Sequence, residues 1–250
     1  HILDTWIQVQ LDTCIAEMTE YMDSYQLDKA LRPLLGFVEE LSTWYLRRSR
    51  DRFKNEADAV IVTEKLIYIL TVVAKLMAPA TPFMAEEIYQ FVKKFDNTHG
   101  DLYVESIHLE NWPKISGSVS PEDSQDSIAR MQKTREIVEL VLALRNKANI
   151  KVRQPLQSLS LPVEVFSQVH VHILQDELNI KQIIVSADDQ ITLDTVVTED
   201  LRIEGLARDV IREIQSKRKE LDLVPSDTIA VTLHVELNKV EDYNCIYNIH

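Results

Sequence analysis

Arginine side chains gather in one short run of this sequence, and their chemistry is that of anion recognition. Arg47, Arg48, Arg50 and Arg52 place four arginines within six residues. A planar guanidinium donates two parallel hydrogen bonds to a phosphate group, so this run could hold the backbone of a nucleic acid. The same arginines could instead stabilise the negative end of their own helix and pair with nearby acids, each for about 0.3 to 1 kcal/mol. Composition alone leaves both alternatives open.

A second basic segment covers residues 145–153 and carries Arg145, Lys147, Lys151 and Arg153 with no acidic residue among them. A solvated loop between two domains is one explanation. In a chain whose formal charge is −13, an anionic partner explains an acid-free basic segment better. A third basic run, residues 217–219, is surrounded by acids and predicts an ordinary solvated helix face.

Catalytic residues are not indicated by any motif in the chain. It contains no glycine-rich phosphate loop, no HExxH motif and no nucleophile elbow, and it has 4 glycines. His170 and His172 would point to different faces of a helix, and no cysteine cluster lies near them to complete a metal site. The pair Glu86-Glu87 lies just inside an expected helix start, where carboxylates mostly act as partners of the helix dipole. We predict no catalytic residue, metal or cofactor in this chain.

The bulk composition describes a globular chain that forms one large core or two modest ones. It has 250 residues, of which 45% are hydrophobic. Cys14 and Cys245 lie at opposite ends and cannot form a disulfide framework, which fits a reducing cytosol. No apolar run approaches the roughly 20 residues of a membrane-spanning helix. The chain starts at His1 with no signal peptide, so we expect a cytoplasmic protein of which it is an internal part.

Apolar residues at three- and four-residue steps predict helices in the first half of the chain. The steps cover residues 3–22, 27–53 and 58–77, and Pro33 is expected to bend the second of these helices. Thr81-Pro82 is expected to cap a fourth helix that ends near residue 94. Four helices predict a bundle over residues 1–117, with a connecting helix and the basic junction over residues 118–154.

The pattern changes after residue 154 to short apolar and β-branched runs. Strands are predicted over residues 156–161, 180–185 and 191–193, and a helix capped by Thr198 follows them. Residues 229–235 alternate as a half-buried strand. The predicted fold class is therefore mainly α, a helical bundle followed by a small α+β domain at residues 155–250.

Two motifs resemble signatures of the class I aminoacyl-tRNA synthetases for branched aliphatic amino acids. Thr43-Trp44-Tyr45-Leu46-Arg47 is similar to the NWYxR signature of their anticodon-binding bundle, with Thr43 where asparagine is usual. The run from Met77 to Tyr89 is similar to the LAPxxPFxAEExW/Y segment of the same group. The two motifs occur in the same order and at a similar separation in that group.

Further segments resemble the isoleucyl-tRNA synthetase family within the group. They are residues 105–113, 145–156, 176–181 and 204–212. The cytosolic, eukaryote-like form is the better match, because the zinc-binding cysteines that often close bacterial versions have no counterpart here. The alternatives are a valyl, leucyl or methionyl enzyme, of which the valyl one usually ends in a coiled coil, and a helical scaffold without RNA binding.

The resemblance implies ATP- and magnesium-dependent charging of tRNA with isoleucine by a longer protein that has a separate editing domain. The HIGH and KMSKS motifs of that chemistry are absent, so we expect this chain to be inactive by itself. The implied partners are tRNA(Ile) and the catalytic and editing domains of the same protein, with neither DNA nor a membrane. The resemblance assigns the bundle to the anticodon stem and the later part to the anticodon loop. It therefore favours RNA contact by Arg47, Arg48, Arg50, Arg52, Arg145, Lys147, Lys151 and Arg153.

Overall fold

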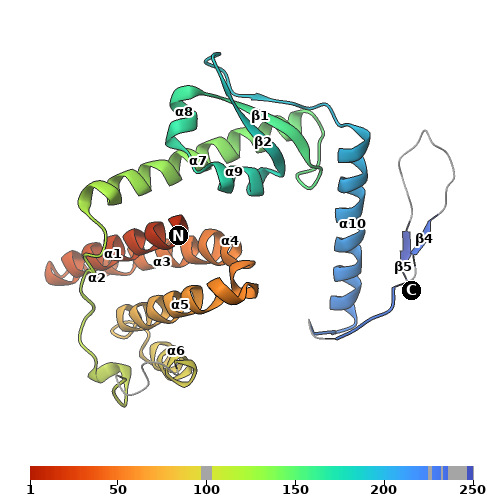
Figure 1. Cartoon of the computed structure of the whole chain (residues 1–250). Coiled ribbons are helices and arrows are strands. Elements are labelled where there is room, and N and C mark those ends of the chain that lie inside the picture. Colours follow the sequence, from red (N-terminus) through yellow and green to blue (C-terminus); the bar gives the residue numbers. More distant parts are fainter. Residues whose placement is uncertain (97–102, 225–226, 232, 236–246, 250) are drawn as a thin grey trace. The chain divides into compact units, whose positions relative to one another are not determined.

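The structure is a computed structural model that describes all residues except 97–102, 225, 226, 232, 236–246 and 250 (Figure 1). The chain divides into two compact units, residues 1–129 and residues 130–250. The described part of the first unit is helical, and the second combines helices with short strands. This arrangement confirms the predicted fold class, while the predicted limits at residues 117 and 154 stay predictions. No helix among the described residues is long and apolar enough to cross a membrane.

The first unit is built on α1 (Ile2–Asp23), as the apolar periodicity predicts. Trp6, Ile7, Leu11 and Met18 are almost completely buried along one side of this helix. The buried side packs against α3 (Arg32–Glu40) and α5 (Glu56–Met77). Burial of side chains of this size contributes roughly 1.5 to 3 kcal/mol each, so α1 is a major part of the core.

The helix predicted over residues 27–53 is not continuous in the structure. It consists of α2 (Leu27–Ala30), α3, the π-helical turn η1 (Leu41–Leu46), α4 (Arg47–Ser49) and the 3-10 turn η2 (Arg52–Lys54). Pro33 lies in the first turn of α3, where a missing backbone N–H leaves no hydrogen bond unmade. The proline therefore starts a helix where we predicted a bend.

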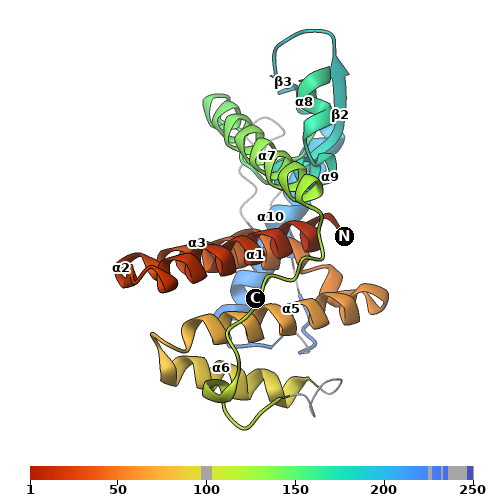
Figure 2. The same ribbon diagram turned by 90° about the vertical axis from the view of Figure 1, so that its left-hand side faces the viewer.

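Helices α5 and α6 (Pro82–Phe95) lie side by side (Figures 1 and 2). Asn55 caps α5 by accepting the Ala57 N–H at 3.0 Å. Thr81 occupies the predicted cap position of α6, but its hydroxyl donates to Met77 O at 3.3 Å and makes no capping bond. The short helix η4 (Ile107–Leu109) then closes the core around Tyr89.

The second unit contains a three-stranded sheet in the order β2-β1-β3. Strands β1 (Leu156–Pro162) and β2 (Ile180–Ser186) are parallel, and β3 (Thr192–Leu193) pairs antiparallel with β1. A parallel pair needs a crossover connection, which here consists of α8 (Val163–Gln168) and α9 (Val171–Leu178). The long helix α7 (Pro121–Lys147) runs across the division between the units, and its Met131, Ile137 and Val141 are buried.

Helix α10 (Glu199–Glu220) begins at Thr198, whose hydroxyl accepts the Leu201 N–H at 3.4 Å. Along this helix Leu201 and Gly205 are buried, and both lie in its first two turns. A separate antiparallel pair, β4 (Leu233–Val235) and β5 (Tyr247–Ile249), follows it. The strand predicted over residues 229–235 is thus confirmed for its last three residues.

Candidate nucleic-acid interface

The first basic run begins at Arg47, the first residue of α4, and the π-helical turn η1 before it carries Thr43, Trp44, Tyr45 and Leu46 of the motif. π-Helical turns are rare and occur mostly at functional sites. In and beside this turn, side chains donate to carbonyl oxygens four residues earlier, which is typical of Ser and Thr inside helices. The three bonds are each 2.8 Å long and run from Ser42 to Val38, from Thr43 to Glu39 and from Arg47 Nε to Thr43.

Tyr45 of this motif points into the core, where it meets a buried ion pair. Its hydroxyl donates to Asp4 Oδ1 at 2.8 Å, and Arg52 donates through Nη1 and Nη2 to both Asp4 oxygens at 2.8 Å. Burial alone would raise the pKa of Asp4, but the hydrogen bonds from Arg52 and Tyr45 outweigh burial and hold it below its ordinary value. Burial, together with the bond to Asp4, raises the pKa of Tyr45. These contacts fasten α1 to η1 and η2.

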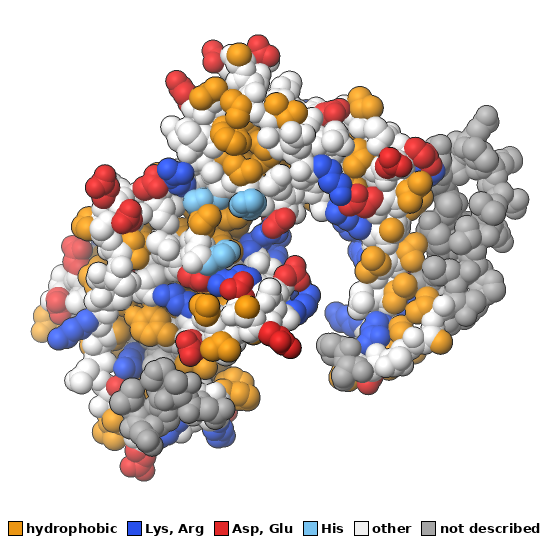
Figure 3. All heavy atoms as spheres, viewed as in Figure 1, with side chains coloured by type: hydrophobic (Ala, Val, Ile, Leu, Met, Phe, Trp, Pro, Cys, Tyr) orange, Lys and Arg blue, Asp and Glu red, His pale blue; other side chains and the backbone are white. Residues whose placement is uncertain are grey.

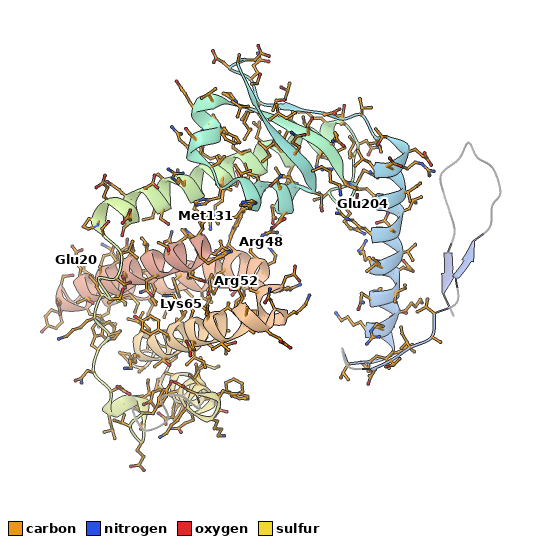
Figure 4. The ribbon with its side chains drawn as sticks, in the orientation of Figure 1. Glu20, Arg48, Arg52, Lys65, Met131 and Glu204 are labelled. Atoms are coloured by element: carbon orange, nitrogen blue, oxygen red, sulfur yellow. The ribbon has the colours of Figure 1, made fainter. Side chains whose placement is uncertain are left out.

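The structure separates the four arginines of the first run. Arg52 is 9% exposed, lies among the helices of the first unit (Figure 4) and is bound to Asp4, so its position does not support RNA contact. Arg47 and Arg50 are exposed and Arg48 is half-buried. The Arg47 guanidinium carbon lies 5.8 Å from the Trp44 ring centroid, a cation–π distance that holds Arg47 along the helix. Arg47, Arg48 and Arg50 remain as surface cations.

The second resemblance motif, the run from Met77 to Tyr89, has a structural role in the first unit. Glu86 accepts hydrogen bonds from Gln90 Nε2 at 2.8 Å, from the Ser106 hydroxyl at 2.8 Å and from the Ile107 N–H at 3.0 Å. These bonds, led by that from Gln90, lower the pKa of Glu86. We predicted a partner of the helix dipole, but the carboxylate instead holds the start of η4. Tyr89 donates to Glu110 at 2.7 Å and completes this contact.

Arg145, the first cation of the basic junction, is completely buried. Its guanidinium donates to backbone oxygens of Lys151 at 3.1 Å, Gln154 at 2.9 Å and Leu178 at 2.6 Å. Burial lowers the pKa of Arg145 to about 10, which leaves it protonated at neutral pH. A buried side chain cannot reach a phosphate group, so this position does not support the predicted RNA contact. Arg145 instead holds the junction loop against the end of α9.

The other three junction cations lie at the surface. Arg153 Nη1 is 3.0 Å and Lys151 Nζ 3.6 Å from carboxylate oxygens of Asp209, so both cations are partly neutralised by α10. Lys151 nevertheless keeps 79% of its side chain exposed. Lys147 is exposed in the last turn of α7. Lys147 and Lys151 are therefore the junction cations best placed to meet a ligand.

A docking contact between the junction and α10 was not predicted from the sequence. Arg208 donates to Asn179 Oδ1 at 2.6 Å and to Glu204 at 2.8 Å, and Asn179 in turn donates to Val152 O at 3.0 Å. Asn179 has φ 51 and ends α9 in a left-handed conformation, which asparagine tolerates better than most residues. The sequence signal for this left-handed turn is an asparagine directly before the β-branched run of residues 180–185.

The same contact explains a glycine on α10. Gln154 Nε2 donates to Leu201 O at 2.7 Å, which brings its side chain against the helix. A Cβ added to Gly205 would lie 2.3 Å from Gln154 Oε1, so a larger residue here would force the end of the Gln154 side chain to move. Helix α10 is thus held to the junction by specific side chains at its first turns.

The first unit also contains a pocket whose lining is mainly acidic and aromatic. This pocket of about 320 Å³ is lined by Glu64, Asp96 and Glu110 among others, and its Tyr103 hydroxyl donates to Asp96 at 2.8 Å. No group of three or more His, Cys, Asp or Glu side chains in the described residues could hold a metal ion. Cys14 is buried, which raises its thiol pKa to about 12, and Cys245 lies outside the described residues.

Comparison with known proteins places most of the chain in one family. The family described as "Anticodon-binding domain of tRNA ligase" matches residues 4–160. The match covers the whole first unit beyond its first three residues, the basic junction and most of β1. It therefore includes both basic segments singled out above.

Curated relatives carry the name isoleucine–tRNA ligase. The protein of Clostridium tetani is 33% identical over 253 residues, which cover 96% of this chain and 24% of the relative. The protein of Clostridium novyi is 38% identical over 75% of this chain and 18% of its own length. That of Chlamydia trachomatis is 31% identical over 93% of this chain and 22% of its own length. The chain thus spans about a quarter or less of these relatives.

Proposed function

This chain belongs to the family of anticodon-binding domains of tRNA ligases, and from that membership we propose that it is the tRNA-binding portion of an isoleucine–tRNA ligase. The observation that carries the proposal is the surface position of Arg47, Arg48 and Arg50 inside the matched region. Arg52, which continues this run, is buried in the core. The phosphate contact that we propose therefore involves these three surface arginines.

Phosphate contacts from these arginines would fix the position of an RNA stem without reading its sequence, because backbone oxygens carry no base identity. Reading of unstacked loop bases requires stacking and hydrogen bonds from other surfaces. The overall charge of −13 limits where RNA can lie, since the acidic surface repels phosphate. We therefore expect weak, salt-sensitive binding, with a Kd of roughly 10⁻⁴ to 10⁻⁶ M.

The test is a fluorescence anisotropy titration of the 250-residue chain with isoleucine tRNA, a mismatched tRNA and an unrelated polyanion. The double variant Arg47→Glu with Arg50→Glu should weaken binding of isoleucine tRNA by at least about tenfold, because two attractive contacts become repulsive. Lys29→Glu with Lys94→Glu is the matched control, since both lysines are exposed in the first unit. Equal affinity for all three ligands, or equal loss in both double variants, would exclude the proposed role.

The activity and partners of the longer protein are part of the proposal. We propose that it charges tRNA(Ile) with isoleucine using ATP and magnesium, in the cytoplasm, through catalytic and editing domains that this chain lacks. The names of the relatives and the missing catalytic motifs support this assignment. The cytosolic, eukaryote-like form stays a prediction that rests on the cysteine pattern, whereas the relatives named above are bacterial.

The alternatives differ in their RNA preference. A valyl, leucyl or methionyl enzyme would give preferential binding of the corresponding tRNA in the same titration. A helical scaffold without RNA binding would give no salt-dependent binding to any of the ligands. The isoleucine assignment is favoured because the three relatives described above share that name.

A further inference from the structure

The first two turns of helix α10 contact the junction. Beyond them, one face of the helix carries cations and no acids. Arg208, Arg212 and Lys219 are separated by four and seven residues, which places them on the same side of an α-helix. Gln215 and Ser216 lie between them on this side and are exposed. We call the face made by these five residues the α10 basic face.

Acidic side chains of the same helix lie away from this face or are neutralised beside it. By the 3.6-residue repeat, Asp209, Glu213 and Glu220 fall on the adjoining side. Asp209 is bound by Arg153 at 3.0 Å and Glu204 by Lys181 at 2.7 Å. The sequence alone predicted a solvated helix face for residues 217–219, because acids surround them there. The helix geometry places Glu213 and Glu220 on the adjoining side, whereas Asp222, just after the helix, lines a pocket together with Lys219.

Two cations of this face are free to meet a ligand. Arg212 and Lys219 are exposed, and within the described part of the chain the side chain of neither has a hydrogen bond or an ion pair. Their neighbours are engaged: Lys217 pairs with Glu220 at 2.9 Å, and Arg218 donates to Val224 O at 2.7 Å and Asp227 O at 3.1 Å. Figure 3 shows Lys and Arg side chains along one edge of α10, beside its hydrophobic side chains.

The basic face is held in a fixed relation to the junction. It continues the side of the helix on which Leu201 and Gly205 dock, and Arg208 bridges to the junction through Asn179. Glu204, labelled in Figure 4, accepts a hydrogen bond from Arg208 Nη2 at 2.8 Å. Lys151 and Arg153 contact Asp209 on the adjoining side of the same helix, so the junction is also fixed to α10 by ion pairs.

We propose that the α10 basic face is a second phosphate-binding surface, which holds the backbone of the same RNA through Arg212 and Lys219. The inference rests on the proposed tRNA binding and assigns a contact to the second unit. Arg145, Asn179 and Arg208 act as positioning residues, because they fix α10 and make no contact with phosphate themselves. The chemistry is ion pairing and hydrogen bonding to phosphate oxygens, which is tolerant of RNA sequence.

The experiment measures binding of a fluorescent hairpin RNA with the sequence of the isoleucine tRNA anticodon arm, at several salt concentrations. The variant Arg212→Ala with Lys219→Ala should weaken binding about tenfold and reduce the slope of log K against log salt by about 1.4, since two phosphate contacts of roughly 0.7 each are lost. Lys29→Ala with Lys217→Ala removes the same charge elsewhere and should leave both values nearly unchanged. Thermal unfolding of both variants should match the parent chain, because all four side chains are exposed.

The outcomes separate this inference from the proposed function. If the parent chain binds the hairpin and the Arg47, Arg50 variant weakens it while the Arg212, Lys219 variant does not, the α10 basic face is no RNA surface and the first site stands. Equal weakening by the control pair would also overturn the inference, because the effect would then come from net charge. If the parent chain binds the hairpin no more tightly than a mismatched hairpin, both the proposed function and this inference fail.

Discussion

Arg52 and Asp4 are 48 positions apart and form a two-pronged ion pair in which both nitrogen–oxygen distances are 2.8 Å. The side chains are 10% and 16% exposed, so solvent screens the pair weakly. The Tyr45 hydroxyl completes the arrangement from the π-helical turn. An arginine that the sequence places in a phosphate-binding run is thus a core residue that joins α1 to the end of that run.

Removal of the Asp4 carboxylate should destabilise the first unit. Asp4→Ala removes both short bonds of the buried Arg52 guanidinium and leaves it the Asp58 carboxylate at 3.9 Å, which should cost about 3 kcal/mol in the free energy of unfolding. Urea denaturation monitored by tryptophan fluorescence measures this loss. Asp28→Ala, at an exposed helix start, should change the same quantity by about 0.5 kcal/mol or less.

The contribution of Asp4 should depend on pH in a predictable direction. Its pKa is lower in the folded chain than in the unfolded chain, so the stabilisation is present above the ordinary aspartate pKa of about 3.9. It is lost as the pH falls through the lower, folded-state pKa. The difference in unfolding free energy between the parent chain and Asp4→Asn should therefore be constant near neutral pH and shrink below about pH 4. A difference that grows on acidification would contradict the lowered pKa.

Replacement of Arg145 should reduce stability. Arg145→Met removes the arginine donor of Gln154 O and Leu178 O, at about 1 kcal/mol or more for each, whereas Lys151 O keeps its bond from the Gln154 N–H at 3.0 Å. Arg145→Lys should lie between the parent and Arg145→Met, because one ammonium group reaches fewer of these oxygens. Lys147→Met, at an exposed position two residues away, is the control for charge removal and should leave the unfolding curve in place. A stable Arg145→Met chain would disprove this role.

Gly205 and Gln154 should show strong energetic coupling. Gly205→Ala forces the end of the Gln154 side chain to move and give up its bond to Leu201 O, which should cost about 1 kcal/mol in the parent chain. In a Gln154→Ala background the same substitution should stabilise the chain by up to about 1 kcal/mol, because alanine favours helix over glycine. A double-mutant cycle of unfolding free energies measures the change of sign. If Gly205→Ala lowers the unfolding free energy equally in both backgrounds, the contact with Gln154 is not the cause.

The salt dependence of RNA binding should distinguish surface arginines from buried ones. Arg50→Ala removes an exposed charge and should lower the slope of log K against log salt by about 0.7 to 0.9. Arg52→Met should lower the stability of the chain instead and leave this slope unchanged at a temperature where the variant is folded. A reduced slope of log K against log salt for folded Arg52→Met would instead indicate that Arg52 contacts RNA.

Several features of this protein could be predicted from local sequence. The apolar steps of residues 3–22 and 58–77, the cap at Thr198 and the β-branched run at residues 180–185 act over neighbouring residues, and the elements appear where they indicate. The break at Leu31 and the π-helical turn could not be predicted in this way, because helix periodicity does not distinguish a widened turn from a regular one.

The sequence by itself determined the fold class, the two basic segments and the resemblance to anticodon-binding domains. The tertiary structure alone decided which cations are available to a ligand. Arg145 and Lys147 stand two positions apart with the same charge, yet one is completely buried and the other exposed. The difference arises because carbonyl groups from the junction and from α9 converge on Arg145, and partners so distant in sequence leave no local pattern.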